Sequence, residues 1–180
     1  MKEKRILAEE SRRKNVPPAV NEAYAKTLGE LVGCKTVFTA DGANQGEYDR
    51  FYAIVARAFP RLTARAQRLQ FGGGCFFYVL RGKNAVKNVL LMSHHDVVDG
   101  GDGWQTDPFT PVVRDGALYG RGTIDTKTPL FAQLQACEEL LASMARSERA
   151  KASAKYAEQE QLLTELQALQ LQHGAGVTGV

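Results

Sequence analysis

The chain has 180 residues, of which 44% are hydrophobic and 24% charged, as in a soluble globular protein of one domain with an appendage. Its net charge of +3 arises at the amino terminus and the remaining charges balance, which excludes an extended nucleic-acid-binding surface. No stretch has the roughly 20 apolar residues that span a bilayer, and the amino terminus lacks the apolar core of a secretory signal. We therefore expect a cytoplasmic protein that binds neither nucleic acid nor membrane.

The three cysteines Cys34, Cys75 and Cys137 are widely separated and form no C-x-x-C pair. An odd, scattered set of cysteines is typical of reduced thiols in a cytoplasmic protein. We therefore expect three free thiols that are buried and pack as small apolar side chains.

The first third of the chain predicts helices separated by loops. A charged lead-in over residues 1–15, helical or frayed, ends at Pro17-Pro18, and the helix that follows is ended by Gly33. Apolar side chains then recur at steps of three and four residues until Pro60, the pattern of an amphipathic helix. The predicted helices cover residues 21–32 and 47–59, with a turn-rich loop over 41–46 between them.

The middle of the chain carries strand signals. A loosely alternating segment comes first, an aromatic run second, and a short segment precedes a Gly-Arg-Gly turn. A continuous apolar run between them is typical of strands buried on both faces of a sheet. The predicted strands cover residues 62–70, 75–80, 89–93 and 117–119, with a Gly- and Pro-rich loop over 97–116. Helices before and after strands indicate an α/β fold with a mixed sheet flanked by helices.

The last third of the chain predicts helices. Thr128 and Pro129 have the chemistry of a cap and a first helical position, and an apolar face follows that should pack on the sheet. The composition then changes to Gln, Ala, Glu and Leu without Gly or Pro, which predicts a long helix. Its narrow apolar stripe consists of Leu162, Leu163, Leu166 and Leu169. We therefore divide the chain into a domain over residues 1–145 and a helical tail over 146–180.

The segment His94-His95-Asp96 ends one predicted strand and is suited to metal binding. Because side chains alternate along a strand, His94 and Asp96 point to the same face and His95 points away. The Asp96 carboxylate can accept a hydrogen bond from one ring nitrogen of His94, which leaves the other nitrogen for a metal ion. The same spacing also fits a buried His that Asp holds for structural reasons.

A second candidate, Asp125, follows the Gly-Arg-Gly turn and precedes a helix. Taken alone, an Asp at this position is explained by its common role in capping the start of a helix, and the glycines are explained by the backbone geometry of a tight turn. The order of three motifs changes this interpretation: H-x-D, then Trp-x-x-x-Pro-Phe, then G-R-G-x-x-D-x-K. Since both residues end separate predicted strands, we expect the His94 ring and the Asp125 carboxylate to lie within about 8 Å, as a shared two-zinc site requires.

These motifs resemble those of the zinc-dependent aminoacylase and carboxypeptidase family of co-catalytic metallopeptidases, which includes glycyl-X carboxypeptidases, desuccinylases and dipeptidases. The resemblance implies zinc as the cofactor, with His94 as a ligand of one ion, Asp125 as the carboxylate bridging two ions, and Asp96 as the catalytic residue that orients His94. It also implies attack of hydroxide on the amide carbonyl of a small peptide or N-acyl amino acid. His95 occupies a variable position and is not assigned to the metal. The matching segments are 90–98, 104–109 and 115–127, continuing over 130–142, with a weaker match from about residue 20.

The chain also departs from the family pattern. The family has a Glu-Glu pair after the bridging Asp, a later acidic ligand, an inserted lid domain and a distal His. Here the nearby acidic pair is Glu138-Glu139, which we interpret as a solvated edge of a helix. Glu158, Glu160 and His173 lie in the tail without supporting motifs. Two protein ligands are fewer than the three that a catalytic zinc normally takes, so the sequence predicts a truncated catalytic domain.

Three functions follow from these observations. The first is a metal-dependent hydrolase of peptide or N-acyl amino acid bonds, incomplete but recognisable by descent. The second is a catalytically inactive, truncated domain that at most binds a metal weakly. The third is an interaction module that acts through pairing of its Leu- and Gln-rich helix. Because the lid domain has no counterpart here, the sequence predicts neither the oligomeric state nor the substrate side-chain preference.

Overall fold

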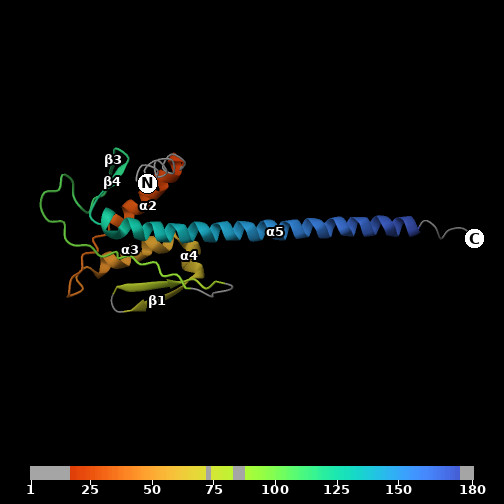
Figure 1. Ribbon diagram of the computed structural model, residues 1–180, viewed down its shortest axis with the longest axis horizontal. Coiled ribbons are helices and arrows are strands. Elements are labelled where there is room, and N and C mark those ends of the chain that lie inside the picture. Colours follow the sequence, from red (N-terminus) through yellow and green to blue (C-terminus); the bar gives the residue numbers. More distant parts are fainter. Residues whose placement is uncertain (1–16, 72–73, 83–87, 175–180) are drawn as a thin grey trace, which may run out of the picture. The chain divides into compact units, whose positions relative to one another are not determined.

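The computed structural model describes residues 17–71, 74–82 and 88–174, with side chains given up to residue 165 (Figure 1). The lead-in over residues 1–15, for which a helical or frayed conformation is predicted, lies outside the described residues. The chain divides into two compact units, one ending at Glu138 and the other beginning at Glu139. Each unit is described separately below.

Three helices come first in the described part of the first unit, which begins at residue 17 (Figure 1). A proline lies in the first turn of the leading helix, where its missing N–H would have no intrahelical partner. The N–H of Gly33 then donates to the carbonyl oxygen of Gly29 at 2.8 Å and ends this helix. Both helices predicted before residue 60 are confirmed, and each begins a few residues earlier than expected. The helices are α2 (Pro18–Val32), α3 (Gln45–Ala58) and α4 (Pro60–Arg65).

Four strands form two antiparallel hairpins. In the first hairpin Phe71 is opposite Cys75, and in the second Val112 is opposite Tyr119. The predicted strands over 75–80 and 117–119 are confirmed. The strand predicted over 62–70 is wrong in its first half, because Pro60 begins a helix there and the strand starts only after it. The strands are β1 (Gln67–Phe71), β2 (Cys75–Val79), β3 (Val112–Arg114) and β4 (Ala117–Tyr119).

The apolar segment over residues 89–93 is extended chain, and the prediction that it is a strand buried on both faces is wrong. A strand of that kind needs a hydrogen-bonded neighbour on each edge, and no described strand pairs with this segment. Within the described ranges, parallel pairing consists of one isolated bridge, between Val37 and Val97. The class of mixed helices and sheets is confirmed, with small antiparallel sheets. The exposed side chains of the segment are Val89 (85%), Leu90 (65%), Leu91 (56%) and Met92 (75%).

The core of the first unit lies between α2, α3, α4 and the first turns of α5 (Thr128–Gly174). Phe131 joins these elements, because its ring centroid lies 5.8 Å from that of Tyr24 in α2 and 6.1 Å from that of Phe59. The start of α5 at Thr128 is confirmed, but its apolar face packs on helices where a sheet was expected. The buried apolar residues are Leu31, Val32, Cys34, Phe51, Ile54, Val55, Phe59, Leu62, Val97, Phe131 and Leu134.

Glu138 ties α5 to the start of α4, and the prediction of a solvated helix edge is wrong for this residue. It is 6% exposed, and its carboxylate accepts hydrogen bonds from the backbone N–H groups of Arg61 at 3.2 Å and Leu62 at 2.9 Å. The Arg61 guanidinium adds an ion pair at 3.0 Å. The first N–H groups of a helix have no intrahelical partner, and this carboxylate accepts hydrogen bonds from two of them in α4. These hydrogen bonds and the Arg61 guanidinium compensate the cost of burying the negative charge.

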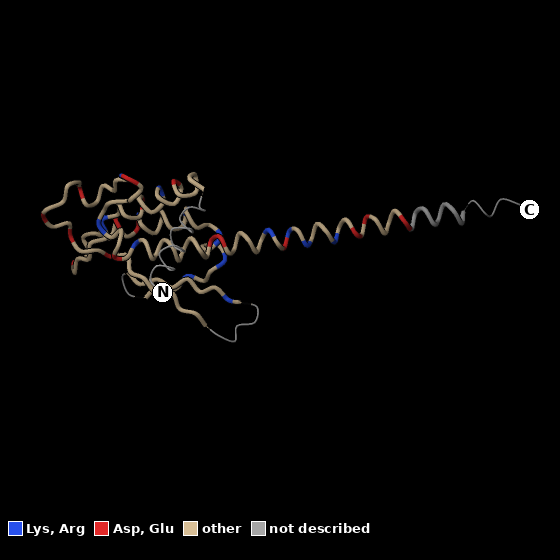
Figure 2. Tube along the Cα trace, turned by 45° about the horizontal axis from the view of Figure 1, so that its top comes forward, with Lys and Arg blue, Asp and Glu red and all other residues tan. Residues whose placement is uncertain are grey.

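The second unit continues α5 without a break through Gly174, so the two helices predicted after residue 128 are one. Every described side chain from Lys151 to Glu165 is exposed, and along this part the basic residues come first and the acidic residues follow (Figure 2). Leu162 and Leu163 of the predicted stripe are exposed, whereas the side chains of Leu166, Leu169 and His173 lie outside the described set. The domain boundary after residue 145 stays a prediction. No helix in the described part of the chain is both long and apolar enough to cross a membrane.

The three cysteines are free thiols, as expected, but they differ in burial. Cys34 is buried and Cys137 is half-buried, whereas Cys75 is exposed at the start of β2. The prediction of burial is therefore wrong for Cys75.

Candidate functional site

The two motifs predicted to meet do so through a pair of hydrogen bonds. The Thr126 hydroxyl oxygen accepts from the N–H of His94 at 3.1 Å and donates to the carbonyl oxygen of His94 at 2.8 Å. This places the end of the extended segment beside the turn η1 (Thr123–Lys127), which follows Gly120-Arg-Gly122. Gly122 has φ 90°, and a Cβ there would lie 2.8 Å from Val97 Cγ1. A glycine is therefore required by both the backbone conformation and the close packing.

The side chains of His94 and Asp125 are in direct contact. His94 Nε2 lies 3.0 Å from Asp125 Oδ1, well within the expected limit. On the other side of the ring, His94 Nδ1 lies 3.0 Å from the carbonyl oxygen and 3.3 Å from the Oδ1 atom of Asp96. The structure thus brings together all three residues singled out from the sequence, and their roles in metal binding and catalysis stay predictions.

The surroundings of His94 determine which ring nitrogen carries the proton. A carbonyl oxygen can only accept, so Nδ1 donates to Asp96 and the neutral ring has its lone pair on Nε2, facing Asp125. Burial lowers the pKa of His94, but the hydrogen bonds to Asp96 and Asp125 and their negative charges outweigh it, and the pKa is raised above its ordinary value. The arrangement favours a cation at or next to Nε2.

The buried side chain of Lys127 holds the turn η1 against the end of α2, a role that was not predicted from the sequence. Its side chain is fully buried, and Nζ donates to the carbonyl oxygens of Leu31 at 3.0 Å and Cys34 at 2.7 Å. These carbonyls lie at the end of α2, where the last groups of a helix lack intrahelical partners. Burial lowers the pKa of Lys127 to about 8. The signal in the sequence that could have indicated this role is the position of Lys127 as the last residue of the G-R-G-x-x-D-x-K motif.

His95 points away from His94, as strand alternation predicts, and joins an aromatic cluster. Its Nε2 lies 2.6 Å from the Tyr52 hydroxyl, and its ring centroid lies 5.1 Å from that of Phe51. Thr36 donates its hydroxyl to the His95 carbonyl at 2.5 Å. Burial lowers the pKa of His95 and raises that of Tyr52. A neutral His95 therefore anchors the segment that presents His94 and Asp96.

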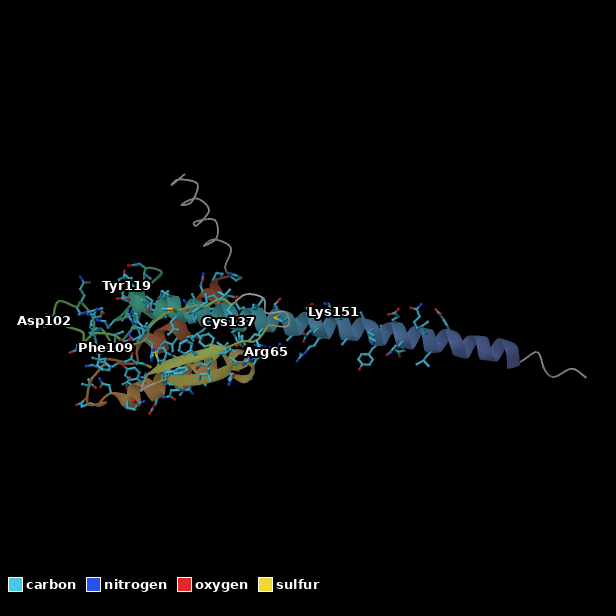
Figure 3. The ribbon with its side chains drawn as sticks, turned by 60° about the horizontal axis from the view of Figure 1, so that its bottom comes forward. Arg65, Asp102, Phe109, Tyr119, Cys137 and Lys151 are labelled. Atoms are coloured by element: carbon cyan, nitrogen blue, oxygen red, sulfur yellow. The ribbon has the colours of Figure 1, made fainter. Side chains whose placement is uncertain are left out.

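A groove of about 590 Å³ opens above His94 and Asp125. The loop that forms one wall is held by Gly100, whose carbonyl oxygen accepts from Trp104 Nε1 at 2.7 Å and from Arg121 Nη2 at 2.8 Å. Figure 3 labels Asp102 and Phe109 on the same loop. The lining residues are Val37, Phe38, His94, Asp96–Asp99, Trp104 and Gly120–Asp125.

The donors present fit part of a zinc site. His94 Nε2 and Asp125 Oδ1 are ligand types that zinc takes, and Asp96 lies on the opposite side of the ring, where it orients the imidazole. Among the described residues, no group of three or more His, Cys, Asp or Glu side chains is arranged to hold a metal ion. A third ligand for zinc would therefore have to come from a group other than the described His, Cys, Asp and Glu side chains.

The segment that carries His94, Asp96 and Asp125 is also the segment that matches a known protein family. Residues 90–158 match the model of peptidase family M20/M25/M40. The chain is 54% identical over 117 residues to a succinyl-diaminopimelate desuccinylase of Nitrosomonas europaea and 35% identical over 113 residues to that of Nitrosococcus oceani. Over residues 90–158 the chain therefore resembles the M20 peptidase family. It is also 32% identical over 124 residues to the human N-fatty-acyl-amino acid synthase/hydrolase PM20D1.

These relatives are much longer than the chain. It spans 29%, 28% and 25% of the length of these three proteins, while the matches cover 64%, 62% and 66% of the chain itself. Among solved structures, human carnosine dipeptidase 1 matches with a TM-score of 0.51 and 27% identity, over 69% of this chain and 29% of that one. The family match over residues 90–158 includes His94, Asp96 and Asp125.

Proposed function

We propose that the chain contributes one wall of the active site of a zinc-dependent hydrolase of peptide or N-acyl amino acid bonds. The observation that carries the proposal is the 3.0 Å approach of His94 Nε2 to Asp125 Oδ1, with Nδ1 held by Asp96. The names of the relatives describe a desuccinylase, an N-fatty-acyl-amino acid hydrolase and a dipeptidase, which act on small substrates. The free thiols fit a cytoplasmic location.

Each residue has a distinct part in this proposal. His94 Nε2 and the Asp125 carboxylate would hold zinc, which when bound polarises a carbonyl group and lowers the pKa of water. Asp96 keeps the Nδ1 proton in place, so the lone pair of Nε2 stays directed at the Asp125 side. Thr126 and Lys127 keep the turn in register with the segment that ends at His94.

The chain on its own should bind zinc weakly and turn over no substrate. The two donors fall one short of the three that catalytic zinc sites use, and among the described residues no group of three or more His, Cys, Asp or Glu side chains could hold a metal ion. Dipeptides and N-acyl amino acids should therefore be hydrolysed no faster in its presence than in buffer. Turnover with added zinc that Asp125→Ala abolishes would contradict this expectation.

Calorimetric titration with zinc tests the proposed site. His94→Ala and Asp125→Asn should each lower the affinity for zinc, because each removes one of two donors. Asp102→Asn, an exposed acidic residue of the neighbouring loop, is the matched control and should bind zinc as the wild type does. Equal affinities for all four proteins would reject His94 and Asp125 as ligands.

A further inference from the structure

Two large side chains, Tyr156 and Leu163, are exposed on one face of the part of α5 that belongs to the second unit. Tyr156 is 72% exposed and Leu163 is 59% exposed. Because they are seven residues apart, about two helical turns, they share a face of the helix, and Ala152 lies on the same face four residues before Tyr156. A convex helix face does not enclose a small ligand, whereas a second helix can pack against it.

The charges of this part of α5 are separated along its length (Figure 2). Residues 146–155 contain four basic side chains and one acidic side chain, whereas residues 156–165 contain three acidic side chains and no basic one. Such a helix repels a copy that runs parallel to it in register and attracts one that runs antiparallel, since each basic half then lies beside an acidic half. The charge pattern therefore favours a second copy of the chain as the partner. The basic residues are Arg146, Arg149, Lys151 and Lys155, and the acidic residues are Glu148, Glu158, Glu160 and Glu165.

One register of an antiparallel pair brings the apolar face and the charges together. When the two helices cross near residue 154, Tyr156 of one copy lies opposite Ala152 of the other, so a large side chain meets a small one. Arg149 and Glu160 are eleven residues apart, about three helical turns, and therefore lie along the same edge of this face. Neither has an oppositely charged residue three or four positions away in the sequence, which is the spacing of ion pairs within a helix.

We propose that α5 pairs antiparallel with α5 of a second copy of the chain through the face that carries Tyr156 and Leu163. In this two-fold symmetric dimer, Arg149 of each copy lies beside Glu160 of the other. The surface is independent of the proposed zinc site, because the residues that line the groove all precede α5. A contact between two single helices is small, so the dissociation constant should be on the order of 100 µM, and the chain should be monomeric in dilute solution.

Sedimentation equilibrium of the full chain measures this pairing. Arg149→Glu and Glu160→Arg should each weaken association roughly tenfold, because by symmetry each turns two attractive contacts into two repulsive ones. The double variant Arg149→Glu/Glu160→Arg should regain the wild-type affinity, since it exchanges the two charges. Wild-type affinity in both single variants, or no recovery in the double variant, would overturn the proposal.

Glu158→Arg is the matched control for the charge variants. Glu158 is exposed and lies two residues before Glu160, on the opposite side of the helix, so association should change less than about threefold at physiological salt. A loss in Glu158→Arg equal to that in Glu160→Arg would show that net charge decides the association, and it would overturn the proposed face.

The apolar contact has its own variant and control. Leu163→Ser should weaken association roughly tenfold, because two leucine side chains leave the interface of each dimer. Gln161→Ser lies on the opposite side of the helix and should associate as the wild type does. Circular dichroism of dilute samples checks that both variants keep the wild-type helix content. Equal affinities of Leu163→Ser and the wild type would overturn the proposal, and so would an equal loss in Gln161→Ser.

Salt and one further variant separate this dimer from other modes of association. Raising NaCl from about 0.05 M to about 0.5 M should weaken the antiparallel dimer severalfold, because salt screens the attraction between its halves. Association that strengthens with salt would indicate parallel pairing and overturn the proposal. Val89→Ser, in the exposed extended segment, should associate as the wild type does. Loss of association in Val89→Ser would assign the contact to that segment, and a wild-type chain that stays monomeric up to about 1 mM would equally overturn the proposal.

Discussion

The hydroxyl group of Thr126 joins both main-chain polar groups of His94, at 3.1 Å to its N–H and 2.8 Å to its carbonyl oxygen. The two residues are 32 positions apart in the sequence. His94 is a candidate metal donor, and Thr126 directly follows the other one, Asp125. This pair of hydrogen bonds therefore fixes the position of the Asp125 turn relative to the His94 ring.

Replacing this hydroxyl should loosen the site. Thr126→Val keeps the side-chain shape and removes both hydrogen bonds, so stability should fall by about 1 kcal/mol and zinc affinity roughly tenfold. Urea unfolding and calorimetric zinc titration measure the two effects. Thr164→Val is the matched control, since Thr164 donates only to the Glu160 carbonyl on an exposed part of α5. Unchanged zinc affinity in Thr126→Val would show that the turn is held without this hydroxyl.

Glu138 should be a main determinant of the stability of the first unit. Glu138→Gln removes a buried charge that serves two backbone N–H groups and a guanidinium, so it should lower the free energy of unfolding by about 1–3 kcal/mol. Urea denaturation followed by circular dichroism measures the change. Glu158→Gln, on an exposed part of α5, should stay within about 0.5 kcal/mol of the wild type. If both variants unfold alike, Glu138 does not act as a cap for α4.

Lys127 should make stability depend on pH in the alkaline range. Burial lowers its folded-state pKa from 10.5 to about 8, so between these values the unfolded chain binds a proton that the folded chain does not. Stability linked to this residue therefore rises as pH increases from about 8 to 10.5, by an amount on the order of 3 kcal/mol.

The comparison of variants isolates this effect. Unfolding of Lys127→Met should lack the rise, and the difference from the wild type between about pH 7.5 and about pH 10 removes the contributions of other titrating groups. Lys151→Met is the control, because Lys151 is exposed on α5 (Figure 3). A wild-type pH dependence in Lys127→Met would mean that the lysine is hydrated in solution.

The tail should be separable from the rest of the chain. Its described side chains from Lys151 onward are exposed, and most helical stability comes from packing of an apolar face. A chain that ends at residue 145 should unfold cooperatively at nearly the wild-type urea midpoint, and limited trypsin digestion of the full chain should first cut after residue 145. Loss of cooperative unfolding in the shortened chain would show that the tail supports the core.

Local patterns in the sequence were sufficient for several elements. The helices α2 and α3 follow from apolar spacing and from proline and glycine at their ends, which depend on neighbouring residues only. The meeting of His94 and Asp125 followed from motifs at two predicted segment ends. It occurred even though the segment before His94 is not a strand, because Thr126 supplies the link that a ladder was expected to give.

Features that depend on distant partners could not be predicted from these patterns. Glu138 has the sequence context of a surface residue, and its burial is decided by the start of α4, 77 residues away. Lys127 is a charged residue whose burial depends on the carbonyl oxygens of Leu31, in the last turn of α2, and of Cys34, just after it. The exposure of residues 89–92 likewise depends on which strands are available to pair, which an apolar run by itself does not specify.

The exposed extended segment over residues 89–92 affects how long the folded protein remains unaggregated in solution. It presents four apolar side chains to solvent and pairs with none of the strands that the structure describes, which makes it a template on which another extended chain can add. Encounters between molecules rise with the square of concentration, whereas folding of one molecule does not depend on it. The useful lifetime of the protein in solution is therefore set by its abundance as much as by its stability.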